Sequence, residues 1–108
     1  MKRLWFKKEM KEAILAGKKC ETIRNHRLKK GRYAAVSGSR FKAEKFADLV
    51  ITSSRRLKSI KSVFNHWKEE GFDSRKLMEQ FMFDTGLYDQ LLISPELYRS
   101  RFVVFARN

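Results

Sequence analysis

The sequence is poor in cysteine, histidine and proline, with one Cys, two His and one Pro in 108 residues. A single cysteine, Cys20, cannot form an intrachain disulfide, which excludes a disulfide-stabilised scaffold. One cysteine and two scattered histidines also cannot build a zinc site of the usual Cys/His type. We therefore expect no metal site, and the residues indicate no cofactor.

Long hydrophobic runs are missing as well. No segment approaches the roughly 20 apolar residues of a membrane span. The basic start Met1-Lys2-Arg3 leads into an amphipathic segment rather than a signal-peptide core. We therefore expect a soluble, cytoplasmic protein without a membrane partner. With 108 residues, among them nine Phe, two Trp and three Tyr, the chain has the size and the bulky side chains of a single domain, residues 1–108.

Acidic residues are scarce in one part of the chain only. Residues 1–60 hold 18 basic and 5 acidic side chains, which accounts for the whole net charge of +13, whereas residues 61–108 hold 7 of each. A basic half beside a neutral half is typical of a surface that binds a polyanion, with nucleic acid the leading candidate. The alternative is a solvated lysine-rich surface, although that pattern usually enriches Glu too.

Hydrophobic periodicity and turn residues predict eight elements. In chain order we expect a strand at 3–6, a helix at 7–16, strands at 20–24, 33–36 and 41–52, a helix from Ser53 or Ser54 to Gly71, a helix from Asp73 or Ser74 to Gly86, and a strand at 98–105. Between the last two, Pro95 favours a short helical turn after Ser94. The strand at 41–52 is long enough to predict a bend or bulge.

The order β-α-β-β-β-α-α-β contains no regular βαβ unit. It predicts an α+β domain in which helices pack against a small, curved or closed, mostly antiparallel sheet. The residues that we expect in the core of the sheet are Ile23, Val36, Leu49, Ile51 and Val104. The helical residues that we expect to cover it are Ile14, Phe64 and Phe81. Trp67 lies with Phe64 on an apolar helical stripe, so we expect it in the core as well.

The densest group of reactive side chains lies at residues 14–24. On a strand, Cys20, Thr22 and Arg24 share one face, and Lys19 in the preceding turn is close enough to reach that face. Lysines near a helix C-terminus also favour the macrodipole, and Thr is an ordinary strand residue. From the residues alone, a structural role is the favoured interpretation.

The segment AILAGKKCETIR at 13–24 resembles the signature of the ASCH domain family, approximately I-x-x-G-x-K-x-x-T-x-R. Residues 68–72, KEEGF, resemble the second conserved block of that family. The similarity spans most of the chain, from the first strand to the last. It implies a PUA-like β-barrel of about five to six strands flanked by helices, with a cleft suited to RNA or modified nucleosides.

Some small bacterial ASCH proteins are amidohydrolases that remove the acetyl group of N4-acetylcytidine with a Lys, a Thr and a Glu. The resemblance places these catalytic roles on Lys19, Thr22 and Glu70, with Glu69 as the rival acid. In that chemistry the Lys accepts the Thr hydroxyl proton, the Thr attacks the acetyl carbonyl, and the Glu assists the leaving amine. Arg24 matches the terminal Arg of the signature and its fork of donors suits a carbonyl oxygen or a phosphate.

This chain departs from those hydrolases because it is strongly basic and has extra helical length between Phe72 and Pro95. The basic excess fits an RNA-sized ligand better than a free nucleoside, although an ordinary surface role is an equally good interpretation of each residue. The candidate nucleic-acid contacts are Lys18, Arg24, Arg27, Lys29, Lys30, Arg32, Arg40, Lys42, Arg55 and Arg56.

Among the remaining side chains, Trp5 and Tyr33 are better explained by core packing than by base stacking. His26 is interpreted as a solvated loop residue or a phosphate contact, and His66 as a helix-surface group.

The leading hypothesis is an RNA-binding ASCH-like domain with a nucleobase pocket at Lys19, Thr22, Arg24 and Glu70. The alternatives are an amidohydrolase acting on N4-acetylcytidine or a similar acylated nucleoside and, third, a ribonuclease. No sequence feature indicates an oligomeric state.

Overall fold

A computed structural model of the chain describes residues 2–39, 41–58, 60–86, 88–89, 92 and 96–107. Arg40 and the turn expected at Ser94 and Pro95 lie outside these residues. The elements in chain order are β1 (Lys2–Trp5), α1 (Lys8–Leu15), β2 (Glu21–Arg24), β3 (Gly31–Ser37), β4 (Glu44–Arg56), α2 (Ile60–Asn65), α3 (Arg75–Asp84) and β5 (Tyr98–Arg107).

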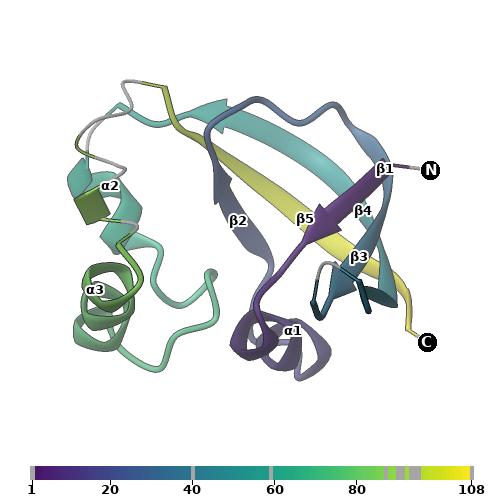
Figure 1. Cartoon of the computed structure of the whole chain (residues 1–108). Helices are drawn as coiled ribbons and strands as arrows, with labels where there is room; N and C mark the ends of the chain where they lie inside the picture. The colour runs from purple at the N-terminus through teal and green to yellow at the C-terminus, as the bar shows by residue number, and fades with distance from the viewer. Residues whose placement is uncertain are drawn as a thin grey trace.

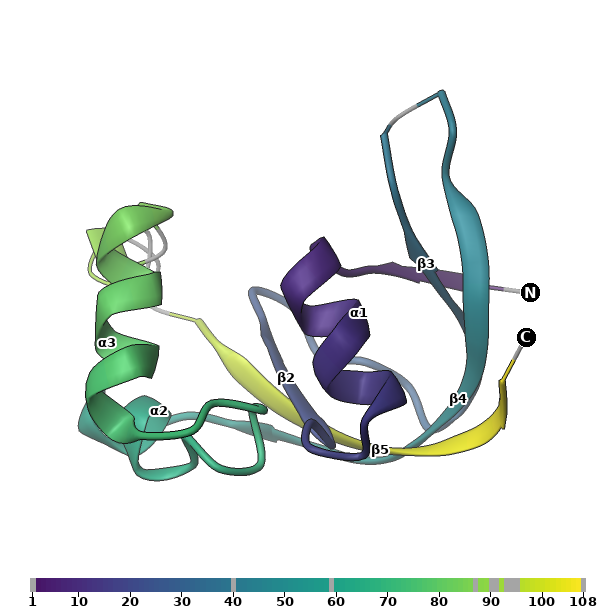
Figure 2. The same cartoon turned by 90° about the horizontal axis from the view of Figure 1, so that it is seen from below.

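The five strands form one sheet in the order β1-β3-β4-β5-β2. β1 pairs with β3 in parallel, and the other three pairings are antiparallel. The sheet curls into a half-barrel that holds α1 on its concave side (Figures 1 and 2), while α2 and α3 lie together beside the β2 edge. The predicted α+β class and mostly antiparallel curved sheet are confirmed.

Two hydrophobic clusters fill the domain. The larger one lies between α1 and the sheet and includes Ile14, Leu49, Ile51 and Phe102, each at most 1% exposed. The smaller one joins α2 to α3. Of the predicted core residues, those that are buried are Ile14, Val36, Leu49, Ile51 and Phe64, and those that are partly buried are Ile23, Trp67, Phe81 and Val104. Phe64, Ile23 and Trp67 pack in the smaller cluster and not in the core of the sheet, because α2 packs against α3.

The predicted bounds of the strand at 41–52 were wrong at both ends, because β4 spans Glu44–Arg56. Phe41 lies in a turn and is 92% exposed, and β4 continues to Arg56 through the serines that were expected to cap a helix. Ser54 instead lies across from Ser100, with their hydroxyl oxygens 2.9 Å apart, and its hydroxyl accepts a hydrogen bond from Leu28 N at 3.2 Å. Pairing with β5 thus overrides the local capping preference. The expected irregularity in this strand is confirmed by a register shift between Ile51 and Ser53.

Candidate functional site

The site is built around a buried ion pair between Lys19 and Glu70. The two residues form an isolated antiparallel backbone bridge just before β2. Lys19 Nζ lies 2.6 Å from Glu70 Oε2, and it also donates to the Glu70 carbonyl oxygen at 3.1 Å. The side chains are only 4% and 5% exposed. Two residues 51 positions apart in the sequence therefore share one desolvated contact.

Gly71 makes this close approach possible. Its φ is +97°, a conformation that side-chain-bearing residues rarely adopt. A Cβ atom at this position would lie 2.8 Å from the Cβ of Lys19 and 2.9 Å from the Cβ of Ala13. The glycine that the sequence marks as a helix end thus lets the chain turn directly against α1 and Lys19.

The sequence left open whether Glu69 or Glu70 is the acid of the site, and the structure distinguishes the two. The backbone carbonyl of Glu69 accepts hydrogen bonds from Cys20 N at 2.7 Å and from Glu21 N at 3.1 Å. Glu69 therefore fixes the start of β2 through its main chain, whereas the Glu70 side chain contacts Lys19. Glu70 is the acid that the fold pairs with Lys19.

The two carboxylate oxygens of Glu70 differ in their contacts, since only Oε2 contacts Lys19 among the described residues. Glu70 Oε1 is buried and accepts no hydrogen bond from any described residue. Burial raises the pKa of the Glu70 carboxyl, and the nearby Lys19 ammonium opposes that rise. Leaving a buried acceptor without a donor is unfavourable, so this oxygen suits a hydrogen bond from a ligand or from water.

Arg24 links the two edge strands of the half-barrel. Its Nη2 donates to the Trp5 carbonyl oxygen at 2.7 Å, across from β2 to the end of β1, and its Nε donates to Thr22 Oγ1 at 3.3 Å. The guanidinium carbon lies 5.0 Å from the centre of the Phe6 ring. Thr22 and Arg24 therefore share one face, as the alternation of the strand predicts, and Arg24 orients the Thr22 hydroxyl.

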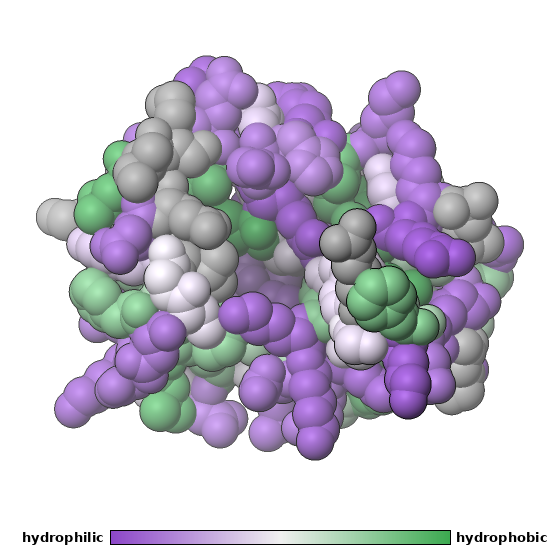
Figure 3. Space-filling view, in the orientation of Figure 1, coloured by the Kyte–Doolittle hydropathy of each residue, from purple (hydrophilic) through white to green (hydrophobic). Residues whose placement is uncertain are grey.

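A cavity of about 210 Å³ opens beside these residues. Its polar lining includes Lys19, Thr22, Arg24 and Glu70. Its apolar lining comes from β1 and the residue after it, from α1, β2 and α3, and from the loop after Glu70. The face shown in Figure 3 is largely hydrophilic, with a hollow near its middle between the side of α2 and α3 and the side of α1. The catalytic set that the resemblance implies is thus brought together at one cavity.

A second hollow of about 560 Å³ adjoins the first, since Trp5, Phe6 and Lys7 line both. Its basic lining residues are Lys7, Lys8, Lys11 and Lys42, and only Lys42 was a candidate from the sequence. We call it the lysine groove. The sequence alone could have indicated a binding role for Lys7 and Lys8. Cations at the N-terminus of a helix interact unfavourably with the helix dipole, so their presence there suggests another role.

The other candidate contacts do not gather at this site. Lys18 Nζ lies 3.7 Å from Asp73 Oδ1. The guanidinium carbon of Arg32 lies 4.0 Å from the centre of the Phe105 ring. Lys30 is exposed in the loop before β3. Arg27 and Lys29 line a separate hollow beside β1, and Arg55 and Arg56 line another beside α2.

Three further expectations were tested by burial and contact. Tyr33 packs in the core as expected, but Trp5 is 44% exposed at the rim of the 210 Å³ cavity, so the core assignment of Trp5 was wrong. His26 is exposed and contacts Asn25. His66 follows the end of α2 and its Nδ1 lies 2.9 Å from Glu21 Oε2, so it is not a plain surface group.

In the described part of the chain, no cluster of three His, Cys, Asp or Glu side chains offers a metal site. Over the same residues, no helix combines the length and the apolar character that a membrane crossing requires.

No family model and no curated protein sequence matches the chain. Solved structures do match, among them two crystal structures. Protein EF3133 from Enterococcus faecalis V583, of family model DUF984, is 16% identical with a TM-score of 0.64 over 100% of this chain and 82% of its own. A serine-to-alanine variant of ZmASCH from Zymomonas mobilis is 14% identical with a TM-score of 0.61 over 98% of this chain and 68% of its own.

The chain has an ASCH-like fold. This agrees with the resemblance of residues 13–24 and 68–72 to the ASCH signature and with a PUA-like half-barrel. At these identities the likeness establishes the fold, and the activity rests on the site itself.

Proposed function

We propose that this ASCH-like domain binds single-stranded RNA, with one nucleobase in the 210 Å³ cavity and the adjoining phosphates along the lysine groove. The observation that carries the proposal is that the cavity and the groove share Trp5, Phe6 and Lys7. A base and its neighbouring phosphates are joined covalently, so a site for both needs this continuity.

The cavity has the size and chemistry for a single base. Its volume is below the roughly 300–1,000 Å³ of pockets for drug-sized ligands. Single-stranded RNA is recognised by stacking on aromatic rings and by hydrogen bonds to base edges. Trp5 offers an exposed ring at the rim, while the unpartnered Glu70 Oε1 can accept a hydrogen bond from an exocyclic amine or ring N–H.

The lysine groove supplies the electrostatic part of binding. Neutralising a phosphate of a single strand releases counterions and contributes about −0.7 to the slope of log K against log salt. Lys8 and Lys11 lie on α1 in this groove, and Lys7 lies 5.5 Å from the centre of the Phe81 ring beside the cavity. The candidate cations Arg27, Lys29, Lys30 and Arg32 are proposed contacts for a longer strand.

The test is fluorescence anisotropy with a labelled single-stranded RNA over a series of salt concentrations. Lys8→Ala/Lys11→Ala should weaken binding and make the salt slope shallower by about 1.4, since two phosphate contacts are lost. The matched control is Lys68→Ala/Lys76→Ala, which removes two exposed lysines from the neutral half of the chain. Equal effects of both pairs, or salt-independent binding, contradict the proposal.

Trp5→Ala tests the base site separately. Stacking of a base on an aromatic ring contributes about 1–3 kcal/mol, so affinity should fall by roughly fivefold or more while the salt slope stays unchanged. An unchanged affinity would place the base elsewhere.

A second candidate function, amidohydrolysis of an acylated nucleoside such as N4-acetylcytidine, is favoured by one specific observation. Lys19, Thr22 and Glu70 line the same cavity, and the Lys19–Glu70 contact is short and buried. Transfer of the shared proton to Glu70 would leave a neutral amine on Lys19. That amine can accept the Thr22 proton as the hydroxyl oxygen attacks the acyl carbon.

The balance of this reaction is that of amide hydrolysis. Collapse of the tetrahedral intermediate breaks the C–N bond, and the leaving amine takes a proton from the Lys19–Glu70 pair. Water then attacks the Thr22 ester and releases the carboxylic acid, which restores the hydroxyl. One water is consumed for each amide bond that is broken.

Incubation of the protein with N4-acetylcytidine, followed by chromatography of the nucleosides, tests this chemistry. Thr22→Ala should abolish turnover while RNA retention on a filter stays nearly unchanged. Glu70→Gln should also abolish turnover, and a thermal melt verifies that this variant folds, because it leaves the buried Lys19 charge uncompensated. Cys20→Ala is the control and should retain turnover, because Cys20 has no role in the reaction. If the wild type produces no cytidine, the cavity is a binding site only. Cleavage of the RNA in a parallel incubation would instead favour a ribonuclease.

A further inference from the structure

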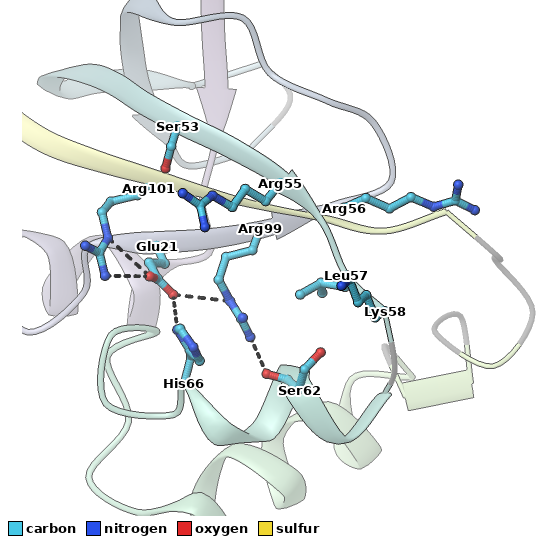
Figure 4. Close-up of a pocket in the computed structure, with 10 residues that line it drawn as sticks. All are labelled: Glu21, Ser53, Arg55, Arg56, Leu57, Lys58, Ser62, His66, Arg99 and Arg101. Carbon is cyan, nitrogen blue, oxygen red and sulfur yellow. Dashed lines mark hydrogen bonds and ion pairs between the residues drawn. The ribbon is translucent and has the colours of Figure 1, made fainter.

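The hollow beside α2, which Arg55 and Arg56 line, is a cavity of about 430 Å³ that is separate from the 210 Å³ cavity. Of the β2 residues, Glu21 lines the 430 Å³ cavity, whereas Thr22, Ile23 and Arg24 line the 210 Å³ cavity. The walls of the 430 Å³ cavity come from β2, β4, β5 and the region of α2 (Figure 4). None of these side chains is used by the proposed function.

The lining is strongly basic. It contains five Arg or Lys side chains and a single carboxylate, that of Glu21, which is 2% exposed. That carboxylate is fully engaged, because Oε1 lies 3.1 Å from Arg101 Nη2 while Oε2 lies 3.2 Å from Arg99 Nε and 2.9 Å from His66 Nδ1. Most of the positive charge at this cavity is therefore not neutralised by the protein.

Glu21 also holds two of the guanidinium groups in place. Arg99 is further fixed by the Ser62 and Val63 backbone carbonyl oxygens, which accept hydrogen bonds from its Nη2. Its side chain is 12% exposed. Arginines that are held before a ligand arrives lose little entropy on binding it, and their planar forks match phosphate oxygens.

The strand register places two positively charged residues opposite each other at this cavity. Arg55 on β4 lies directly opposite Arg99 on β5, and like charges at directly opposed positions are destabilising. Arg55 and Lys58 form no ion pair within the described part of the chain. In Figure 4 the Arg55 side chain extends along the cavity towards Arg101 and Glu21, whereas Arg56 extends away from them.

We propose that this cavity binds a terminal phosphate group, either of a free nucleotide or of an RNA end. The excess of cations over a single engaged carboxylate suits a compact group with more than one negative charge, whereas a backbone phosphodiester carries only one. The volume lies within the range of small-molecule pockets. The lining includes no Phe, Tyr or Trp ring on which a base could stack.

The first experiment uses inorganic pyrophosphate as the probe and isothermal titration calorimetry as the measurement. Arg55→Ala/Lys58→Ala removes two exposed cations that support no described contact, so the fold should be retained, which a thermal melt verifies. We expect about a tenfold or greater loss of affinity, since charge-assisted hydrogen bonds are lost. The matched control, Lys76→Ala/Arg107→Ala, removes the same charge from two exposed residues that do not line the cavity, and it should bind as the wild type does.

No pyrophosphate binding by the wild type, or equal weakening by both double variants, overturns the proposal. Thermal shift gives a second readout, because a ligand of the folded state raises the melting temperature. At one pyrophosphate concentration the rise should be smaller for Arg55→Ala/Lys58→Ala than for the wild type and the control. This arm requires no RNA, so it is independent of the proposed RNA binding.

The second experiment distinguishes the two sources of the phosphate and rests on the proposed RNA binding. A short RNA with a 5′-phosphate is compared with the same RNA carrying a 5′-hydroxyl. Tighter binding of the phosphorylated RNA that is lost in Arg55→Ala/Lys58→Ala assigns the cavity to an RNA end. Equal binding of both RNAs, with pyrophosphate binding intact, assigns it to a free nucleotide.

Discussion

Replacement of the Lys19–Glu70 pair by apolar residues should separate the folding role of this pair from its role at the site. Lys19→Met and Glu70→Leu keep much of the side-chain volume and remove the charges. Each single change leaves the other charge buried at a position that is 4% or 5% exposed. Loss of one partner of a buried pair costs about 3–5 kcal/mol, because the remaining charge is uncompensated.

The double variant should behave differently. Burying two ions carries a desolvation penalty that their attraction only partly repays, so replacing both with apolar side chains is often neutral or stabilising. We therefore expect Lys19→Met/Glu70→Leu to be within about 1 kcal/mol of the wild type, or more stable. The coupling free energy between the two positions should then be at least about 5 kcal/mol in magnitude.

Urea denaturation followed by circular dichroism measures these values. With a slope of about 1–3 kcal/mol per molar urea, each single variant should lower the midpoint by at least about 1 M. The double variant should retain the midpoint but lose the binding of a nucleoside in the cavity. Single variants that cost less than about 1 kcal/mol, or losses that simply add in the double variant, refute the assignment of a buried, coupled pair.

Three further predictions follow from particular residues. Gly71→Ala should lower the melting temperature and reduce nucleoside binding, because its Cβ would overlap the side chains of Ala13 and Lys19, and an unchanged variant would contradict this packing. Burial, and next the Glu21 carboxylate, raise the pKa of the Cys20 thiol above the ordinary thiol pKa of 9.0, so less thiolate forms near neutral pH. Alkylation of Cys20 by iodoacetamide should therefore be slow until the pH exceeds 9.0, and the pH profile of an ordinary thiol would contradict this. Lys29→Ala/Lys30→Ala should weaken binding of a long single-stranded RNA and make its salt slope shallower by up to about 1.4, with little effect on a short RNA, and anisotropy with RNAs of two lengths measures both.

Local signals in the sequence predict the short elements well. The Phe6, Met10 and Ile14 spacing and the glycine at 17 define a helix, and the structure has α1 at Lys8–Leu15 with Gly17 at φ +76° after it. Local sequence signals fail where pairing with a strand that is distant in the sequence competes with a local conformational preference. Ser53 and Ser54 are good helix caps, yet β5 pairs with them and extends β4 to Arg56.

The site shows the same division. The resemblance selects Lys19, Thr22 and Glu70, and the alternation along β2 places Thr22 and Arg24 on one face. No local pattern states that Arg24 donates to the Trp5 carbonyl across the open edge of the half-barrel, or that Trp5 remains exposed. Those facts depend on how the sheet curls, which brings β1 and β2 near each other although they lie at opposite ends of the strand order.

The sequence by itself determines the charge asymmetry, the α+β class and the reactive residue types, because these depend on composition, periodicity and spacing along the chain. Only the tertiary structure decides which of those residues meet. It pairs Lys19 with Glu70 rather than Glu69, sends neighbouring residues of β2 into two different cavities, and opposes Arg55 to Arg99. The physical reason is that strand register and the curl of the sheet are set by the packing of the whole core, so contacts between distant residues follow from every element together.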